Sequence, residues 1–111
     1  MKETPNLSYI TKLSKGDTLF EKKLLAIIGD ELAGEIESYR LHLQNRDFTK
    51  TSEDVHKLCH KISILGMEKG YKIAKEYEMD LLQKNIRLKS NFEEILTSLT
   101  LFIDTYKNET L

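Results

Sequence analysis

The sequence has few of the residues that break helices, cross-link chains or anchor them in membranes. One proline and five glycines in 111 residues leave long stretches free to form helix. The single cysteine, Cys59, cannot form an internal disulfide, so nothing indicates an oxidising compartment. No run approaches the roughly 18 apolar residues of a membrane span, and residues 1–5 lack the apolar core of a signal peptide. The sequence therefore predicts a cytoplasmic protein with no membrane partner.

An excess of charge of one sign is also absent. The formal net charge is −1, which argues against a nucleic-acid partner, because such proteins are usually strongly basic. Apolar residues make up 40% of the chain and charged residues 32%, as in ordinary soluble proteins. The length of 111 residues suits one domain with a modest core and is too short for two. We expect a single domain over residues 1–111, and one small core favours a monomer.

Apolar residues instead recur at steps of three and four through most of the chain, which is the period of amphipathic helices. No stretch alternates with period two, so we expect no sheet. The pattern predicts five helices, at about residues 6–14, 17–45, 47–66, 67–84 and 88–107. Short connections between long helices favour antiparallel neighbours. The predicted fold is all-α, an antiparallel up-down four-helix bundle with the short N-terminal helix as a lid.

Polar residues mark the expected helix starts. Asp17 is a good N-cap for the long second helix. The third helix begins at either Asp47 or Thr51, and Phe48 favours the earlier start because it precedes the apolar Val55 by seven residues. Gly66 is expected to end or bend this helix.

The most informative stretch runs from residue 55 to 66. At roughly 100° per residue, one face of this helix carries an apolar stripe of Val55, Leu58, Ile62 and Leu65. His56 points almost directly away from the stripe. His60 and Ser63 lie within about 40° of His56, and Lys57 and Lys61 form one shoulder beside them. The helix thus presents an imidazole to solvent with cations nearby.

This stretch resembles the histidine phosphotransfer (HPt) domain of two-component phosphorelays. That family has a leucine two residues after its histidine, a glycine ten residues after it, and an apolar-Glu pair about one helix later. His56, Leu58, Gly66 and the pair Tyr77-Glu78 match this pattern. The starts of the second and third helices, Gly16-Asp17 and Asp47-Phe48, are also similar to the family, so that the resemblance spans essentially the whole chain.

The resemblance implies that neutral His56 accepts a phosphoryl group from an aspartate of a receiver domain and later donates it to another. Partners would be response-regulator receiver domains or a hybrid histidine kinase. The chain would be a phosphocarrier without kinase activity of its own, and it has no Gly-rich phosphate loop for ATP. No cofactor is implied here, because the family's Mg²⁺ belongs to the receiver.

Two positions depart from the family. Its lysine three residues after the histidine is Cys59, and its glycine one position later is His60. The lysine is thought to help hold the phosphoryl group, and the glycine to give a docking partner room. Lys57 and Lys61 are then expected to supply positive charge, and His60 a hydrogen bond. Ser63 and an exposed Ile64 are expected to contact phosphate or partner.

Other interpretations of these residues remain open. His56, Cys59 and His60 have the i, i+3, i+4 spacing of metal ligands on one helix, and a zinc site there would draw a fourth ligand from His42. A degenerate relay domain would instead be an adaptor that docks a receiver without phosphate chemistry. His56 would be an ordinary surface histidine in the absence of the family pattern. Glu78 is expected to cap or pair on a helix surface rather than to take part in chemistry.

Overall fold

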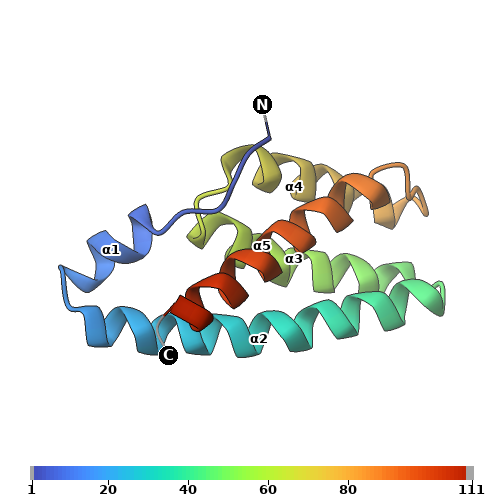
Figure 1. The fold of residues 1–111 in the computed structure, drawn as a ribbon. Helices are drawn as coiled ribbons and strands as arrows, with labels where there is room; N and C mark the ends of the chain where they lie inside the picture. Colours follow the sequence, from blue (N-terminus) through green and yellow to red (C-terminus); the bar gives the residue numbers. More distant parts are fainter. Residues whose placement is uncertain (1, 110–111) are drawn as a thin grey trace.

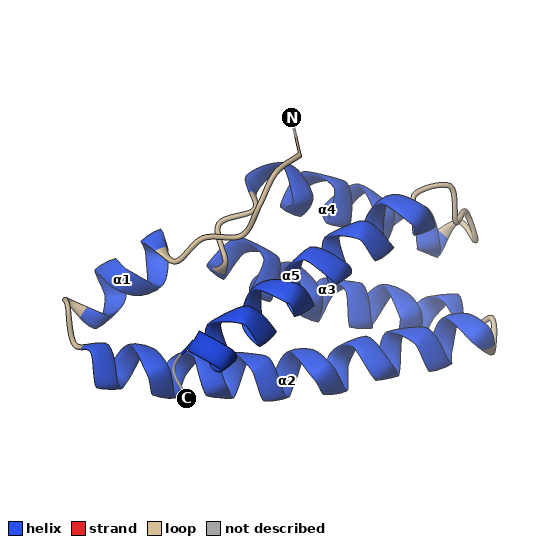
Figure 2. Ribbon diagram, viewed as in Figure 1, coloured by secondary structure: helices blue, strands red, loops and turns tan. Residues whose placement is uncertain are grey.

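The structure is a computed structural model that describes residues 2–109, with side chains described for residues 2–107. Within this range the chain is helical throughout, without strands, as predicted (Figure 2). The helices are α1 (Ser8–Ser14), α2 (Thr18–Gln44), α3 (Phe48–Ile64), α4 (Glu68–Leu82) and α5 (Lys89–Glu109). Their ends lie within two residues of the predicted ones, so the apolar periodicity located every helix.

Side chains cap the two helices whose starts were predicted from aspartates. The Asp17 carboxylate accepts from the backbone N–H of Phe20 at 3.1 Å, and Asp47 does the same for Lys50 at 3.1 Å. Each satisfies an N–H group that has no partner within the helix. The alternative start at Thr51 is wrong, because Thr51 lies inside α3 and its hydroxyl donates to the Asp47 carbonyl at 2.7 Å.

The core forms where the apolar stripes of the helices meet. α3 packs against both α2 and α4, while α5 contacts α2 and α4 and crosses in front of α3 in Figure 1. The predicted stripe of α3 is completely buried; its members are Val55, Leu58, Ile62 and Leu65. Burial of one whole side of α3 fixes which residues of this helix face solvent.

The N-terminal segment is attached to the turn between α3 and α4. The backbone N–H of Asn6 donates to the Leu65 carbonyl at 2.8 Å. The Glu3 carboxylate accepts from the backbone N–H groups of Lys69 and Gly70 at 2.9 and 2.8 Å. α4 has no capping side chain of its own, so a residue distant in sequence performs that task. The segment then leads into α1, which packs on α2 through the buried Ile10.

Gly66 ends α3 in a conformation that other residues avoid. Its φ is +77°, and a Cβ atom there would collide with the side-chain amide of Asn6. We expect Gly66→Ala to lower the free energy of unfolding by about 1–2 kcal/mol, the cost of a left-handed conformation for an L-residue. Urea denaturation would measure this. Gly34→Ala is the matched control, because a Cβ atom there meets open space within α2, and it should stabilise the helix by up to about 1 kcal/mol.

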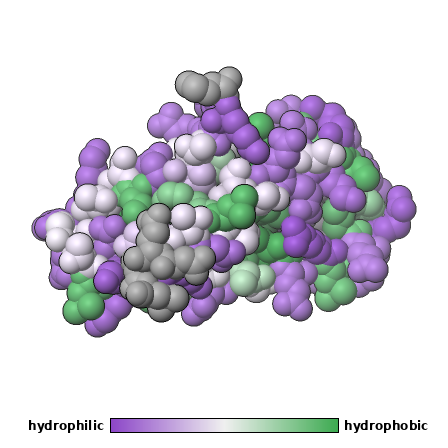
Figure 3. Space-filling model, in the orientation of Figure 1, coloured by the Kyte–Doolittle hydropathy of each residue, from purple (hydrophilic) through white to green (hydrophobic). Residues whose placement is uncertain are grey.

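The face seen in Figure 3 is mostly hydrophilic, with hydrophobic patches between the charged residues. Among the described residues, no helix is long and apolar enough to cross a membrane.

Candidate functional site

His56 lies on the solvent side of α3, as the helical period predicts. Its side chain is 54% exposed, and its Nδ1 lies 3.2 Å from each carboxylate oxygen of Glu78 on α4. A carboxylate only accepts hydrogen bonds, so Nδ1 carries the proton and donates it. In the neutral ring the Nε2 lone pair is then left free. This tautomer is the one that a nucleophilic imidazole requires.

Backbone and core contacts hold Glu78 in this position. The Ser52 hydroxyl, one turn before His56 on α3, donates to the Glu78 carbonyl at 2.9 Å. The preceding residue, Tyr77, is completely buried, and its hydroxyl lies 2.7 Å from that of Tyr39 on α2. Burial raises the pKa of Tyr77, so this hydroxyl stays neutral. These contacts, at Glu78 itself and at the preceding residue, fix where the carboxylate meets His56. Glu78 pairs with His56 and Lys75 on the surface of α4, as expected from the sequence.

Lys75 supplies a cation that the sequence did not lead us to expect. Its ammonium lies 3.2 Å from Glu78 Oε1, and the hydrogen bond to Glu78 raises the pKa of Lys75, so that it remains charged. Tyr71, Lys75 and Glu78 follow each other at steps of four and three, which places them on one face of α4. This spacing in the sequence indicates that the three residues share one face of α4, but it does not indicate that this face lies beside His56 on α3.

These groups surround a concavity of about 290 Å³ between α1, α3 and α4. Five residues predicted for the site line it: His56, Cys59, His60, Ser63 and Ile64. Three more come from other helices: Tyr9, Tyr71 and Lys75. Tyr9 lies in α1, directly after the segment that Asn6 and Glu3 attach to the α3–α4 turn. The side of the concavity that Tyr9 forms therefore depends on long-range contacts. No local pattern in the sequence indicates this side of the concavity.

The two predicted lysines lie elsewhere. Lys61 forms ion pairs with Glu31 and Glu35 of α2 at 3.2 and 3.0 Å, and its side chain is only 12% exposed. Burial disfavours its charge, but the hydrogen bonds to both carboxylates outweigh this and raise the pKa of Lys61. Lys57 is exposed and is not among the residues that line the concavity. The prediction of a cationic shoulder beside His56 is therefore wrong for Lys61, because that flank of α3 faces the acidic residues of α2.

Ile64 is more buried than expected, and Cys59 is buried as well. Ile64 is half-buried and packs against the core, whereas the sequence suggested an exposed docking residue. Cys59 is 2% exposed and belongs to the core. Burial and the nearby Glu78 carboxylate raise the pKa of Cys59 to about 11.

The Cys59 thiol should therefore resist alkylation in the folded protein. At pH 8 the thiolate, which is the reactive form, should be scarce, and reaction with iodoacetamide should be slow until urea unfolds the chain. The rate on the folded protein should rise as the pH approaches 11. Mass spectrometry of the alkylated fraction over time would measure both effects. Rapid alkylation at pH 8 without urea would contradict the burial of this side chain.

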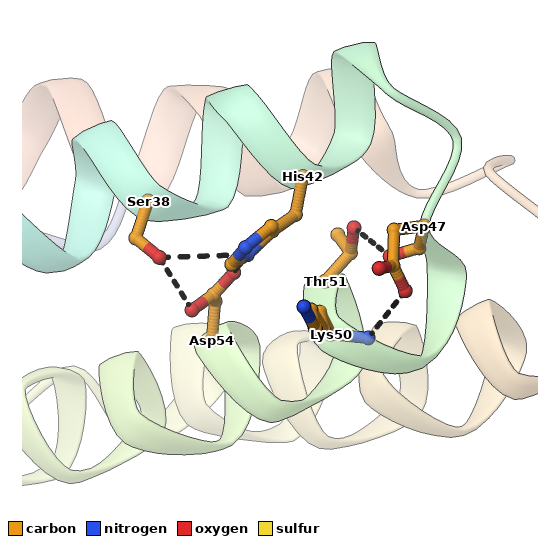
Figure 4. Close-up of polar contacts among 6 residues, drawn as sticks. All are labelled: Ser38, His42, Asp47, Lys50, Thr51 and Asp54. Carbon is orange, nitrogen blue, oxygen red and sulfur yellow. Dashed lines mark hydrogen bonds and ion pairs between the residues drawn. The ribbon is translucent and has the colours of Figure 1, made fainter.

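The third histidine is occupied away from the concavity. His42 on α2 lies 2.5 Å through Nδ1 from the carboxylate of Asp54 on α3, and the Ser38 hydroxyl donates to the same carboxylate at 2.9 Å (Figure 4). Asp54 is only 5% exposed, so these two contacts compensate the burial of its charge. Because Ser38 and Asp54 share one ring nitrogen, the trio lacks the arrangement of a nucleophilic triad. It ties α2 to α3.

The alternative interpretation, a three-ligand metal site, does not form in the described part of the chain. No group of three His, Cys, Asp or Glu side chains is placed there to hold a metal ion. Cys59 points into the core, and His42 is paired with Asp54. His56 and His60 remain together, with ring centroids 5.2 Å apart and planes inclined by 75°.

Comparison with known proteins adds no family assignment. No protein-family model, curated protein or solved structure matches this chain.

Proposed function

We propose that this chain is a histidine phosphotransfer protein, in which Nε2 of His56 accepts a phosphoryl group from the aspartyl phosphate of a receiver domain. The observation that carries the proposal is the exposed imidazole whose Nδ1–H is held by Glu78. Phosphoryl transfer depends on positioning and charge stabilisation more than on covalent chemistry by the protein. An imidazole held by Glu78 at the edge of an open concavity is sufficient for an acceptor.

The proposed architecture is an antiparallel up-down four-helix bundle formed by α2 to α5, with α1 beside it. The contacts of α2 with α3, α3 with α4, α4 with α5 and α5 with α2 are those expected of helices that close around one core. In such a bundle α3 and α4 provide a rigid surface for the site. Rigid elements position reacting groups more accurately than loops do.

The transfer step balances without a cofactor in this chain. The Nε2 lone pair attacks phosphorus, the P–O bond to the aspartate breaks, and the aspartate leaves as a carboxylate. The imidazole becomes a cation that bears the phosphoryl group on Nε2 and the proton on Nδ1. The Glu78 carboxylate stabilises this cation through the hydrogen bond that is already in place. Lys75, which lines the same concavity, provides the positive charge that the residues next to His56 do not.

The test is transfer from a phosphorylated receiver domain in the presence of Mg²⁺. We expect the receiver to lose its phosphate while the chain gains an acid-labile, base-stable label, as a phosphohistidine should. Binding of the receiver without a label would favour an adaptor and overturn the relay proposal. A base-labile or acid-stable label would place the phosphate on another type of residue.

Removal of the Glu78 carboxylate should slow the reaction without blocking it. In Glu78→Ala the His56 ring loses the acceptor that selects its tautomer and orientation, and we expect transfer to slow by about 10- to 100-fold, as for other partners that orient a reactive histidine. Rapid-quench measurement of label formation would give the rate. Glu78→Gln is the matched control, because its amide oxygen still accepts from Nδ1 but carries no negative charge. Its rate should lie between those of the natural chain and Glu78→Ala, since the tautomer is kept and the charge that stabilises the phosphorylated cation is lost. Equal loss in both variants would indicate that the negative charge matters rather than the tautomer.

A further inference from the structure

His56 and His60 form a pair that the transfer reaction does not fully use. They lie one turn apart on α3, both are exposed, and both line the same concavity. Their ring centroids are 5.2 Å apart. Two imidazoles at i and i+4 of a helix project side by side and can direct one nitrogen each at a common point. Neutral imidazole is a preferred ligand of Zn²⁺, Cu²⁺ and Ni²⁺.

Glu78 prepares His56 for coordination as well as for phosphoryl transfer. Histidines that bind metals usually donate their second ring N–H to a carboxylate, which fixes the tautomer and increases the basicity of the ligating nitrogen. The contact between His56 Nδ1 and Glu78, at 3.2 Å, is such an arrangement. It leaves Nε2 as the ligating nitrogen, on a ring that lines the concavity. The carboxylate also offsets the nearby charge of Lys75, its partner at 3.2 Å.

We infer that His56 and His60 together bind a divalent transition-metal ion such as Zn²⁺, and that the bound ion blocks phosphoryl acceptance. Both reactions need the same Nε2 lone pair of His56. The second half of this inference rests on the proposed function, and the first half does not. Cys59 also lines the concavity, but it is only 2% exposed and belongs to the core, so we give the site two protein ligands. Water completes the coordination, so the ion exchanges readily and acts as a reversible inhibitor.

Calorimetric titration of the full chain with ZnCl₂, on protein purified without a histidine tag, tests the first half. We expect one Zn²⁺ per chain, no saturable binding in His60→Gln, and binding weaker by about 10- to 100-fold in Glu78→Ala. Cys59→Ala should bind as tightly as the natural chain. Its failure to bind, with an unchanged circular dichroism spectrum, would show that the thiol is a ligand and overturn the two-histidine site. Equal binding by His60→Gln would overturn it too.

Histidine ring resonances locate the ion without relying on a variant. On addition of Zn²⁺ the ring protons of His56 and His60 should shift or broaden, while those of His42, which pairs with Asp54 away from the concavity, should not. An equal response of all three histidines would mean non-specific binding and contradict the inference.

Phosphoramidate, a small donor that phosphorylates accessible imidazoles, tests the second half without a receiver. The phosphorus–nitrogen bond of the donor breaks, ammonia leaves, and Nε2 of His56 gains the phosphoryl group. Saturating Zn²⁺ should suppress this label in the natural chain. In His60→Gln the label should be the same with and without Zn²⁺, whatever its basal level. Suppression in both would point to an effect on the donor and overturn the antagonism. Label from phosphoramidate but none from a receiver would refute the relay while the metal site stands.

Discussion

Replacement of His56 by glutamine is expected to abolish the phosphoryl label completely. Glutamine is polar, fits a position that is 54% exposed, and its amide N–H₂ can still donate to Glu78. It has no nitrogen lone pair able to attack phosphorus. The folding stability should change by no more than about 0.5 kcal/mol, as for most surface substitutions. The variant therefore separates the chemistry of the ring from the integrity of the helix that carries it.

The matched control is His60→Gln. This substitution changes the other imidazole of the concavity, four residues along the same helix and with its ring 5.2 Å from that of His56. We expect the label to survive, because Glu78 contacts His56 and leaves its Nε2 free. Transfer followed by phosphate analysis of both variants would settle which ring reacts. A label that persists in His56→Gln and disappears in His60→Gln would show that His60 is the acceptor. It would contradict the proposal that Glu78 orients the reactive ring.

The sequence could predict the features that depend on a single helix, namely which of its residues are buried and where it begins. The stripe from Val55 to Leu65 is buried, His56 is exposed, and Asp17 and Asp47 cap the helices that they were expected to start. Each of these results follows from the 3.6-residue period or from N–H groups that need a local acceptor. Such features need no knowledge of the neighbouring helices.

The sequence could not show which neighbour lies beside each flank of α3. Lys61 and Lys75 illustrate this: the first is on the predicted helix but faces the acids of α2, and the second comes from α4 and reaches the site. Tyr9 lines the concavity next to a segment whose Glu3 and Asn6 bind the α3–α4 turn, at residues 60 or more positions later in the sequence. Side-chain direction follows from the helical period, whereas the identity of the partner follows from packing.

Phe92→Ala should be the most destabilising of the substitutions considered. Phe92 on α5 is completely buried, and its ring centroid lies 5.1 Å from that of Tyr39 and 5.2 Å from that of Tyr77. The substitution removes a large apolar side chain and leaves a cavity beside two rings that are joined by a hydrogen bond. The free energy of unfolding should fall by about 3–5 kcal/mol, a large share of the roughly 5–15 kcal/mol typical of such a domain.

Leu101→Ala is the matched control for Phe92→Ala, because it shortens an apolar side chain on the same helix at a position that is 61% exposed. We expect a change within about 0.5 kcal/mol, whereas Phe92→Ala should lower the melting temperature by more than about 10 °C. Similar effects at both positions would show that α5 does not bury Phe92 between α2 and α4.

The comparison also bears on the site, since Tyr77 precedes Glu78 and a loosened aromatic cluster would release the carboxylate that holds His56. We therefore expect folded Phe92→Ala to transfer phosphate moderately more slowly than the natural chain, when both are measured well below the melting temperature of the variant.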